Sequence, residues 1–394
     1  SGPVKGPNYD ISAIYGQQAG GNLFHSFRQF DIRTGEVANF GVSPDIQNII
    51  SRVTNGEISR IDGTLRSTIS GTSEISGANL FLLNPAGLIF GPNAALDLGG
   101  SFHASTADYL RMGAHERFYA LPGNDVLSVE HPSAFGFLET PIGKISFEGG
   151  GSMNRPYRET TEPDDSGVSD EPAEPDVSDD EIIVSTGLSV SDGETLSVIA
   201  GDIEMTGTSY KNDEDDNDPL GNLNAPGGRI NMAAVASPGE VSPTDSGLDI
   251  SSESLGEITL SDYSLVKVSG EESGDIFIRA GRFFADRSTL EADTYGDKAG
   301  GITDIQVSEM SLNQSDIYSD ITGKGRGGSI SLGIAESLVM TEESRIFADA
   351  TGQDADSGDA GNVRIETEML SLTDGSIISS ETFDGGGKGG VVRI

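Results

Sequence analysis

Alternating apolar and polar residues mark short strands along the last third of the chain. In one stretch the apolar positions fall at every second residue, in three separate groups. A period of two is that of a β-strand with one buried face, whereas a helix repeats at about 3.6 residues. The groups are Ile330 and Leu332, Leu338 and Met340, and Ile346 and Ala348. Gly, Asp, Ser and Thr separate them, so the pattern predicts three short strands joined by turns.

This three-strand unit recurs along the chain. A phrase of Ser, any residue, Ile or Leu, any residue, and Ala or Ser begins at Ser288, Ser315, Ser344 and Ser376, in steps of 27, 29 and 32 residues. Gly stands before the first strand of the units, at positions 274, 301, 328, 361 and 390. Repeats with a period of about 20 to 50 residues indicate a solenoid in which each unit packs only on its neighbours.

The repeats predict an all-β protein that folds as a right-handed parallel β-helix, or β-solenoid. Each unit is expected to form one coil and to hydrogen-bond to the next coil at about 4.8 Å. Inward positions stack as apolar columns, outward positions stay polar, and Gly is expected at the corners where the chain bends. The right-handed sense follows from the rule for parallel crossover connections.

Two regions differ in composition from the repeats. Residues 10–110 are rich in large apolar side chains, so residues 1–140 are expected to form a bulky, irregular cap that shields the first coil. Residues 141–394 are expected to continue the β-helix. Acidic inserts near 152–181 and 211–222 interrupt them and are interpreted as excursions from the solenoid wall. The chain ends within a strand phrase, so we expect the native polypeptide to continue beyond residue 394.

The charge narrows the range of partners. There are 63 Asp and Glu against 24 Lys and Arg, a formal charge of -39. Such a surface repels nucleic acid and anionic membranes. No run approaches the roughly 18 apolar residues of a membrane helix, so membrane insertion is not expected. There is no Cys, which excludes disulfides and thiolate metal sites.

Four motifs in the first 110 residues follow one another in a characteristic order. They are GNLFHSF at 21–27, NIISRV at 48–53, GANLFLLNPAGLIFGPNA at 77–94 and GGSFHASTAD at 99–108. Together they resemble the N-terminal secretion domain of filamentous-haemagglutinin-like exoproteins from two-partner secretion systems, most closely the cyanobacterial type. The resemblance is dense over residues 10–115, and the Gly-rich repeats also resemble this family.

The resemblance implies a function and a location. It implies an N-terminal secretion region and folding nucleus of a large adhesin-like exoprotein. It implies recognition by a dedicated outer-membrane β-barrel transporter, and a location outside the cell, with retention on the outer-membrane surface left open. The absence of Cys suits passage of an unfolded chain through an oxidising periplasm. A host, cell-surface or polysaccharide ligand is left unidentified.

The family motif Asn-Pro-Asn-Gly-Ile falls on residues 84–88, with Ala86 and Leu88 as departures. Physically, Asn84 to Gly87 read as a β-turn, in which Pro presets φ and Gly accepts a positive φ. The turn serves the cap alone or also contacts the transporter, and both interpretations stay open. The candidate residues for transporter recognition or the cap turn are Asn22, Asn48, Arg52, Asn84, Pro85, Gly87 and Asn93.

Other sequence features raise two alternatives to a secretion domain, an enzyme and a metal site. β-Helices also host polysaccharide-binding and polysaccharide-degrading proteins, but no repeat keeps paired acids beside Arg or His, so no enzymatic activity and no catalytic residue are expected. His25 and His103 are expected to pack or to form hydrogen bonds. Asp213, Asp215 and Asn217 resemble the start of a calcium loop but lack its Gly and distant Glu. No cofactor or specific metal site is expected, and loose calcium binding by the acidic surface is the alternative.

Overall fold

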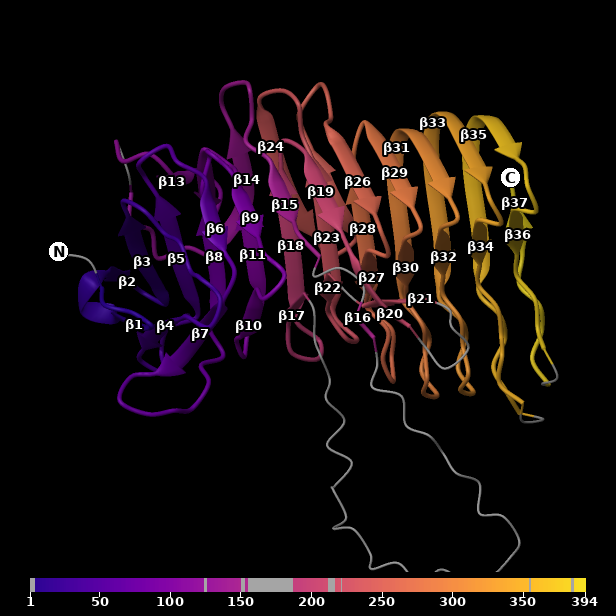
Figure 1. The fold of residues 1–394 in the computed structure, drawn as a ribbon, viewed down its shortest axis with the longest axis horizontal. Helices are drawn as coiled ribbons and strands as arrows, with labels where there is room; N and C mark the ends of the chain where they lie inside the picture. Colours follow the sequence, from indigo (N-terminus) through magenta and orange to yellow (C-terminus); the bar gives the residue numbers. More distant parts are fainter. Residues whose placement is uncertain are drawn as a thin grey trace, which may run out of the picture.

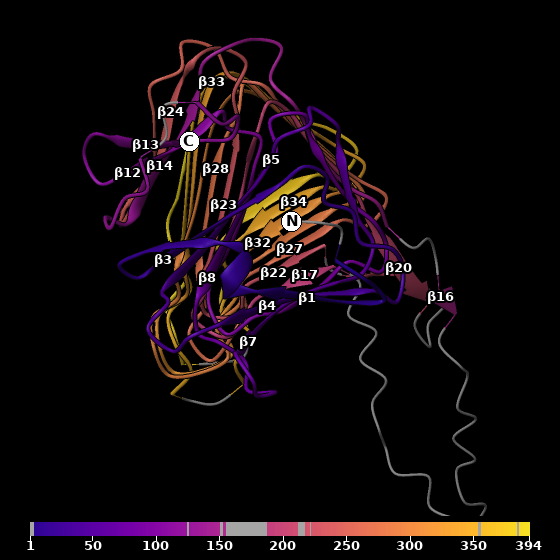
Figure 2. The same cartoon turned by 90° about the vertical axis from the view of Figure 1, so that its left-hand side faces the viewer.

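The chain winds as a series of stacked coils with strands in nearly every turn (Figure 1). The computed structural model describes residues 4–123, 126–149, 153–154, 187–211, 217–220, 222–353, 356–383 and 386–394. Successive coils pair in parallel along three walls, and the view along the axis shows these walls enclosing one core (Figure 2). The parallel β-helix is therefore confirmed.

We call the longest of the three ladders the front wall. Each of its strands pairs in parallel with the strand of the next coil. Its strands are β3 (Asn22–Phe27), β5 (Asn48–Val53), β8 (Asn79–Leu83), β11 (Phe102–Ser105), β18 (Thr195–Ala200), β23 (Arg229–Ala234), β28 (Asp275–Arg279), β31 (Ile302–Asn313), β33 (Ser329–Thr341), β35 (Asn362–Leu372) and β37 (Val392–Arg393).

The second wall follows each front-wall strand around a corner and joins the front wall at β31. It contains β6 (Ser59–Ile61), β9 (Leu88–Phe90), β15 (Ile145–Phe147), β19 (Ile203–Thr206), β26 (Glu257–Ser261) and β29 (Arg282–Asp286).

The third wall has two parts, an N-terminal ladder and a C-terminal one. The first part holds β1 (Asn8–Ser12), β4 (Val37–Val42), β7 (Thr64–Ile69) and β10 (Ala95–Asp97). The second part holds β17 (Leu188–Ser189), β22 (Leu223–Asn224), β27 (Leu265–Lys267), β30 (Thr289–Glu291), β32 (Asp316–Tyr318), β34 (Arg345–Phe347) and β36 (Ile377–Ser379).

The core consists of apolar columns that run along the axis. One column stacks Ile278, Ile305, Leu332 and Ile365 in direct register, and all four are buried. The six alternating positions that sequence periodicity assigns to one unit are likewise all buried. Each coil thus covers the apolar side chains of the coil before it, and the gain in buried area repeats at every step.

The division into three separate strands is wrong for three of the C-terminal coils. There the first two predicted strands form one long strand each, β31, β33 and β35, with an irregular register inside the first two pairings. In the preceding coil Gly281 separates β28 from β29, and Ser308 occupies the equivalent position in β31. Without Gly at this corner the backbone stays extended through a bulge.

Another corner uses residues other than Gly in a left-handed conformation. The residue before the recurring Ser has a positive φ at Arg287 (48°), Gln314 (46°) and Glu343 (61°). The Ser side chain then bridges coils, since the N–H of Ser288 donates to Ser315 Oγ at 3.0 Å and that of Ser315 to Ser344 Oγ at 3.1 Å. The recurring Ser is therefore a corner support, because it satisfies backbone groups that the bend leaves unpaired.

A second layer, which we call the outer sheet, covers part of the front wall and is absent from the sequence-based expectation. It is antiparallel and arises from two excursions of the chain. Its inner face and the outer face of the front wall share a second apolar core that includes Phe81, Phe118 and Phe277. The strands are β12 (Tyr109–Met112), β13 (Glu116–Tyr119), β14 (Pro132–Phe137), β24 (Gly239–Thr244) and β25 (Gly247–Ile250).

The first hundred residues form regular coils, so the expectation of an irregular cap is wrong for most of them. Their large apolar side chains line the same core as the later coils, including Phe40, Leu65 and Phe90. The first front-wall strand is instead covered by a short antiparallel strand, β2 (Gln17–Ala19), which follows a 3₁₀ turn, η1 (Ala13–Tyr15). By pairing with β3, strand β2 covers a strand edge that would otherwise be exposed at this end of the solenoid.

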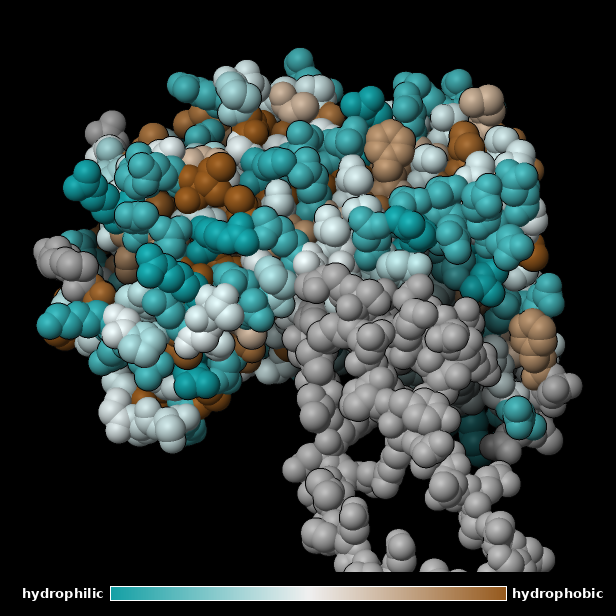
Figure 3. Space-filling view, viewed as in Figure 1, coloured by the Kyte–Doolittle hydropathy of each residue, from teal (hydrophilic) through white to brown (hydrophobic). Residues whose placement is uncertain are grey.

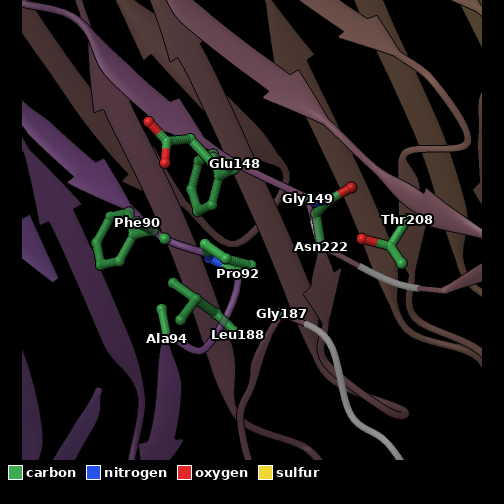
Figure 4. A pocket seen from close by; sticks show the side chains of 11 residues that line it. Phe90, Pro92, Ala94, Glu148, Gly149, Gly187, Leu188, Thr208 and Asn222 are labelled. Carbon is green, nitrogen blue, oxygen red and sulfur yellow. The ribbon is translucent and has the colours of Figure 1, made fainter. Parts of the chain in front are cut away.

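The larger predicted acidic insert falls almost entirely outside the described residues, and half of the smaller one does. The large one is flanked by Gly149 and Gly187, and these two residues line one small pocket beside Phe90 and Leu188 (Figure 4). The chain therefore leaves the wall and returns to it at nearly the same place. The short strands near the inserts are β16 (Met153–Asn154), β20 (Thr208–Lys211) and β21 (Asn217–Leu220).

Candidate functional site

The asparagines of the N-terminal motifs form a ladder on the front wall. Asn22, Asn48 and Asn79 stand in direct register in three successive coils. Asn48 Nδ2 donates to Asn22 Oδ1 at 2.8 Å, and Asn79 Nδ2 donates to Asn48 Oδ1 at 3.1 Å. Asn79 Oδ1 in turn accepts the backbone N–H of Ser101 at 2.9 Å. Two sequence candidates, Asn22 and Asn48, are thus brought together, and Asn79 was missed.

The ladder also holds the outer sheet in place. Asn22 Nδ2 donates to the backbone carbonyls of Ser128 at 3.0 Å and Glu130 at 2.7 Å, which precede strand β14. Asn22 and Asn48 are both buried. A buried amide left without partners is costly, so these contacts fix the route of the chain between β13 and β14.

Arg52 holds the other end of this segment, at Tyr119, where strand β13 ends. Its Nε donates to Ser26 Oγ at 2.8 Å, and its Nη1 donates to the backbone carbonyl of Tyr119. The guanidinium lies over the ring of Phe118, 4.5 Å from the ring centroid. Arg52 is buried, and a buried guanidinium with hydrogen bonds and an aromatic partner is strongly oriented.

The predicted turn at Asn84 is present. The backbone N–H of Gly87 donates to the carbonyl of Asn84 at 3.0 Å, and Asn84 Oδ1 accepts the N–H of Ala86 at 3.1 Å. Asn84 Nδ2 reaches the preceding coil, where it donates to the carbonyl of Glu57 at 2.9 Å and to Ser59 Oγ at 3.1 Å. The Asn84 side chain therefore supports the turn and joins two coils at once.

Pro85 and Gly87, the two other candidate residues of this turn, pack closely against the next coil. Gly87 has φ +125°, a conformation that side chains avoid, and a Cβ there would lie 3.0 Å from the carbonyl oxygen of Lys144. Pro85 is half-buried, and its carbonyl oxygen would lie 2.3 Å from a Cβ at Gly143. The turn is thus shaped by the coil that follows it as well as by its own residues.

Asn93 belongs to a different corner from the rest of the candidate set. Its backbone N–H donates to Asp62 Oδ1 at 3.0 Å, and its side chain is exposed. Hydrogen bonds from Thr34 and Asn93 outweigh partial burial and lower the pKa of Asp62. The structure therefore joins Asn93 to Asp62 and Thr34, and not to the asparagine ladder or the Asn84 turn.

The histidines of the motifs are packed side chains, as the sequence predicts. Burial lowers the pKa of His25 to about 4 and that of His103 to about 3. His103 stacks on Phe81, with ring centroids 4.3 Å apart, and its Nδ1 lies 2.9 Å from Ser197 Oγ. His103 Nδ1 faces a hydroxyl in the next coil rather than a carboxylate, so no acid–base pair is formed at this position.

The calcium candidates are not placed. Asp213 and Asp215 lie outside the described residues, and nothing is described of the Asn217 side chain. Over the residues that are described, no group of three or more His, Asp and Glu side chains could hold a metal ion. Loose calcium binding therefore stays a prediction.

A groove lies on the front wall beside β25, at the edge of the outer sheet. Four of its charged side chains form two ion pairs, Arg279 with Asp304 at 2.6 Å and Arg364 with Glu366. Asp249 and Glu368 also line it. A glycosidase needs two opposed carboxyls, one with a raised pKa. The carboxyls of Asp293 and Asp320, whose pKa values are raised, do not line this groove.

Polar side chains cover much of one outer face of the coils (Figure 3). On the face seen in Figure 3, hydrophilic side chains predominate over the coils toward the C-terminus. Within the described part of the chain, no helix has the length and apolar character that crossing a bilayer requires.

Comparison with known proteins identifies the family. The sequence model of the TPS secretion domain matches residues 4–296, well over half of the chain and on both sides of residue 140. Among solved structures, the HMW1 secretion domain from Haemophilus influenzae is similar, with 15% identity, 96% of each chain covered and a TM-score of 0.45. No curated protein matches the sequence. The extent of the family match shows that this chain belongs to the TPS secretion domain family, the secretion domains of two-partner secretion exoproteins.

Proposed function

We propose that this chain is the secretion region and folding nucleus of a secreted adhesin-like exoprotein, and that a cognate outer-membrane β-barrel transporter recognises it. Membership of the TPS secretion domain family supports the secretion role, because such domains belong to exported exoproteins. In this proposal the coils begin an extracellular stalk that carries no enzymatic activity. The proposal covers both release into the medium and retention on the outer-membrane surface.

The observation that carries the proposal is the burial of the motif residues. Asn22, Asn48, Arg52 and Asn84 are all buried, and their polar atoms bond to other coils or to the outer sheet. A partner cannot contact these side chains in the folded domain. If the transporter reads them, it does so while the chain is still unfolded, and the same residues then direct folding after export.

The parallel stacking of coils supports a role in export. Each coil completes the hydrogen bonding and the apolar core of the coil before it. Folding outside the cell, coil upon coil, then releases free energy as the chain emerges and opposes backward movement. Variants with weakened C-terminal coils are expected to leave the cell more slowly.

The test is export of the 394-residue chain from a Gram-negative host with and without its cognate transporter. The proposal expects the chain in the medium or on the cell surface only when the transporter is present. Equal export without the transporter, or none with it, would overturn the proposal. A transporter lacking its periplasmic domains is the control for leakage through the barrel.

A binding assay separates recognition from folding. The periplasmic domains of the transporter are mixed with urea-unfolded, rapidly diluted chain, either wild type or Asn84→Ala. Weaker binding by the Asn84→Ala chain supports recognition of Asn84 before folding. Unchanged binding combined with a less stable folded variant assigns Asn84 to the cap turn alone.

A further inference from the structure

A column of acidic side chains runs along one corner of the C-terminal coils, just beyond the strands of the third wall. Asp293, Asp320, Asp349 and Glu381 hold equivalent positions in four successive coils, since the residues that directly follow them form parallel bridges. The backbone N–H of Asp320 donates to Asp293 Oδ1 at 2.9 Å, that of Asp349 to Asp320 Oδ1 at 3.0 Å, and that of Glu381 to Asp349 Oδ1 at 2.6 Å.

These carboxyls replace backbone acceptors at a bend. The neighbouring N–H groups of Thr294 and Ile321 bond to carbonyls of the next coil in the usual way, whereas the N–H groups of the acidic column bond to side chains. At the first member of the column, Asp293, the N–H bonds instead to Ser269 Oγ at 2.9 Å. The column is therefore part of the hydrogen-bonding framework that joins the coils.

The position favours the neutral form of the carboxyls. Burial raises the pKa of Asp293 to about 6 and that of Asp320 to about 7, and it also raises the pKa of Asp349. Backbone N–H donors act in the opposite direction but are weaker than burial. The stacked acids add to the effect, because a charge on one member disfavours a charge on the next.

The other charged groups that face the column are already paired. Lys267 Nζ lies 2.6 Å from Glu291 Oε1, and Glu291 also accepts the hydroxyl of Tyr318 at 3.0 Å. Arg345 faces Asp320 but is ion-paired with Asp316 at 2.6 Å. Neither cation is therefore free to neutralise the column, which leaves proton binding as the means of doing so.

We propose that Asp293, Asp320 and Asp349 bind protons when the C-terminal coils fold, so that ambient pH sets the stability of this end of the solenoid. The folded pKa values lie above the value of about 3.9 for Asp in an unfolded chain. The stabilisation is full below about pH 4 and is lost as the pH rises through the folded values of about 6 and about 7. The folded C-terminal coils are thus more stable at mildly acidic pH than at alkaline pH.

The test compares the full 394-residue chain with the triple variant Asp293→Asn, Asp320→Asn, Asp349→Asn. Asn keeps a carbonyl acceptor for each N–H but does not titrate. Urea unfolding and hydrogen exchange of peptides from residues 289–381 are measured at about pH 5 and about pH 8, where one such group alone changes the folded-to-unfolded ratio at least about tenfold. Exchange is corrected for its intrinsic pH dependence.

We expect the wild-type coils to lose at least about tenfold in this ratio between the two pH values, and the triple variant to lose less than about threefold. Asp374→Asn is the matched control, because Asp374 is exposed in a turn of the adjoining coil and keeps the wild-type loss. If the triple variant does not fold, Asp320→Asn alone is compared in the same way. A wild-type loss that persists unchanged in these variants, or that Asp374→Asn also removes, overturns the proposal.

Discussion

At the N-terminal end, single Asn side chains join successive coils through hydrogen bonds. Asn48 both donates to Asn22 and accepts from Asn79, and it therefore joins three coils. It lies in the wall, at the start of β5, rather than in a turn. Asn at such a position is unfavourable for a strand unless its side chain is fully bonded, which it is here.

Asn48→Ala is predicted to destabilise the folded domain. The substitution leaves the buried Oδ1 of Asn22 and the partly buried Nδ2 of Asn79 without these partners, at a cost of about 1–3 kcal/mol for the buried atom and less for the other. Urea unfolding of the two chains measures the loss. Asn93→Ala is the comparison, because Asn93 is exposed, and it is expected to cost less than about 1 kcal/mol. Equal losses in the two variants would contradict the role given to the ladder.

Gly87→Ala tests the conformation of the turn. With φ at +125° and a Lys144 carbonyl oxygen 3.0 Å from the added carbon, the variant is expected to lose about 1–3 kcal/mol. Gly56→Ala is the control, since Gly56 has φ +75° and no atom within 4 Å of the added carbon; its cost is expected to be about 1 kcal/mol. Thermal unfolding of both variants gives the comparison, and a control that loses more stability would count against close packing at Gly87.

At the scale of elements, the outer sheet is held to the front wall by a few polar clamps. Arg229 reaches from β23 to the turn between β24 and β25, where it donates to the carbonyls of Thr244 at 2.6 Å and Asp245 at 2.7 Å. Its guanidinium also lies 4.7 Å from the ring centroid of Phe277. The turn of the hairpin β24–β25 is therefore tied to the wall beneath it by the Arg229 side chain, in addition to the apolar contacts of the outer sheet.

Arg229→Ala is predicted to loosen this hairpin without unfolding the coils. Loss of charged hydrogen bonds costs about 1.5–3 kcal/mol, and hydrogen exchange should rise in residues 239–250 while residues 329–341 stay protected. Arg282→Ala is the control, because Arg282 makes an exposed ion pair with Glu257 at 3.1 Å. Exchange that rises equally in all coils would show that Arg229 stabilises the solenoid as a whole.

Sequence periodicity predicts the coils well and the outer sheet poorly, for a physical reason. Strands with one buried face alternate, and the units after residue 274 do so. The strand β8 reads Asn-Leu-Phe-Leu-Leu, and all four apolar side chains are buried because both of its faces are covered. An unbroken apolar run in a parallel strand is the available signal for a second layer.

The candidate residues show the limit of motif reading. The motifs single out Asn22, Asn48, Arg52 and Asn84, which are buried in the fold, but a motif cannot tell whether a side chain faces a partner or another coil. The register that brings Asn48 beside Asn22 and Asn79 depends on coil length. Coil length is set by loops whose sequences vary.

At the scale of the whole molecule, the front wall changes character where the outer sheet ends. Under the sheet its outward positions are covered, and they include the apolar Phe81 and Phe277 as well as the buried polar Ser197 and Asn231. One coil further on, Asp304 takes the position of Phe277, followed by Ser331 and Arg364 in the next two coils. The coils beyond β28 therefore need no second layer, and they resemble one another closely enough to be exchanged.

A variant that duplicates residues 302–328 is predicted to fold. Ile302 pairs with Ser329, so the duplicated segment is one coil of 27 residues in the register of its neighbours. Small-angle scattering should show a particle longer by about 4.8 Å, with unfolding no less cooperative than in the parent chain. Duplication of residues 229–274, whose hairpin belongs to the outer sheet, is the contrasting variant and is expected to misfold or aggregate.

The switch from Phe277 to Asp304 along one column also separates two kinds of evolutionary freedom. Upstream of this position, an added coil would need an added part of the outer sheet to cover it. The number of coils there is therefore tied to the architecture of the secretion domain. Downstream of it, coils can be gained or lost one at a time, so the length of such an exoprotein can change without redesign of the secretion domain.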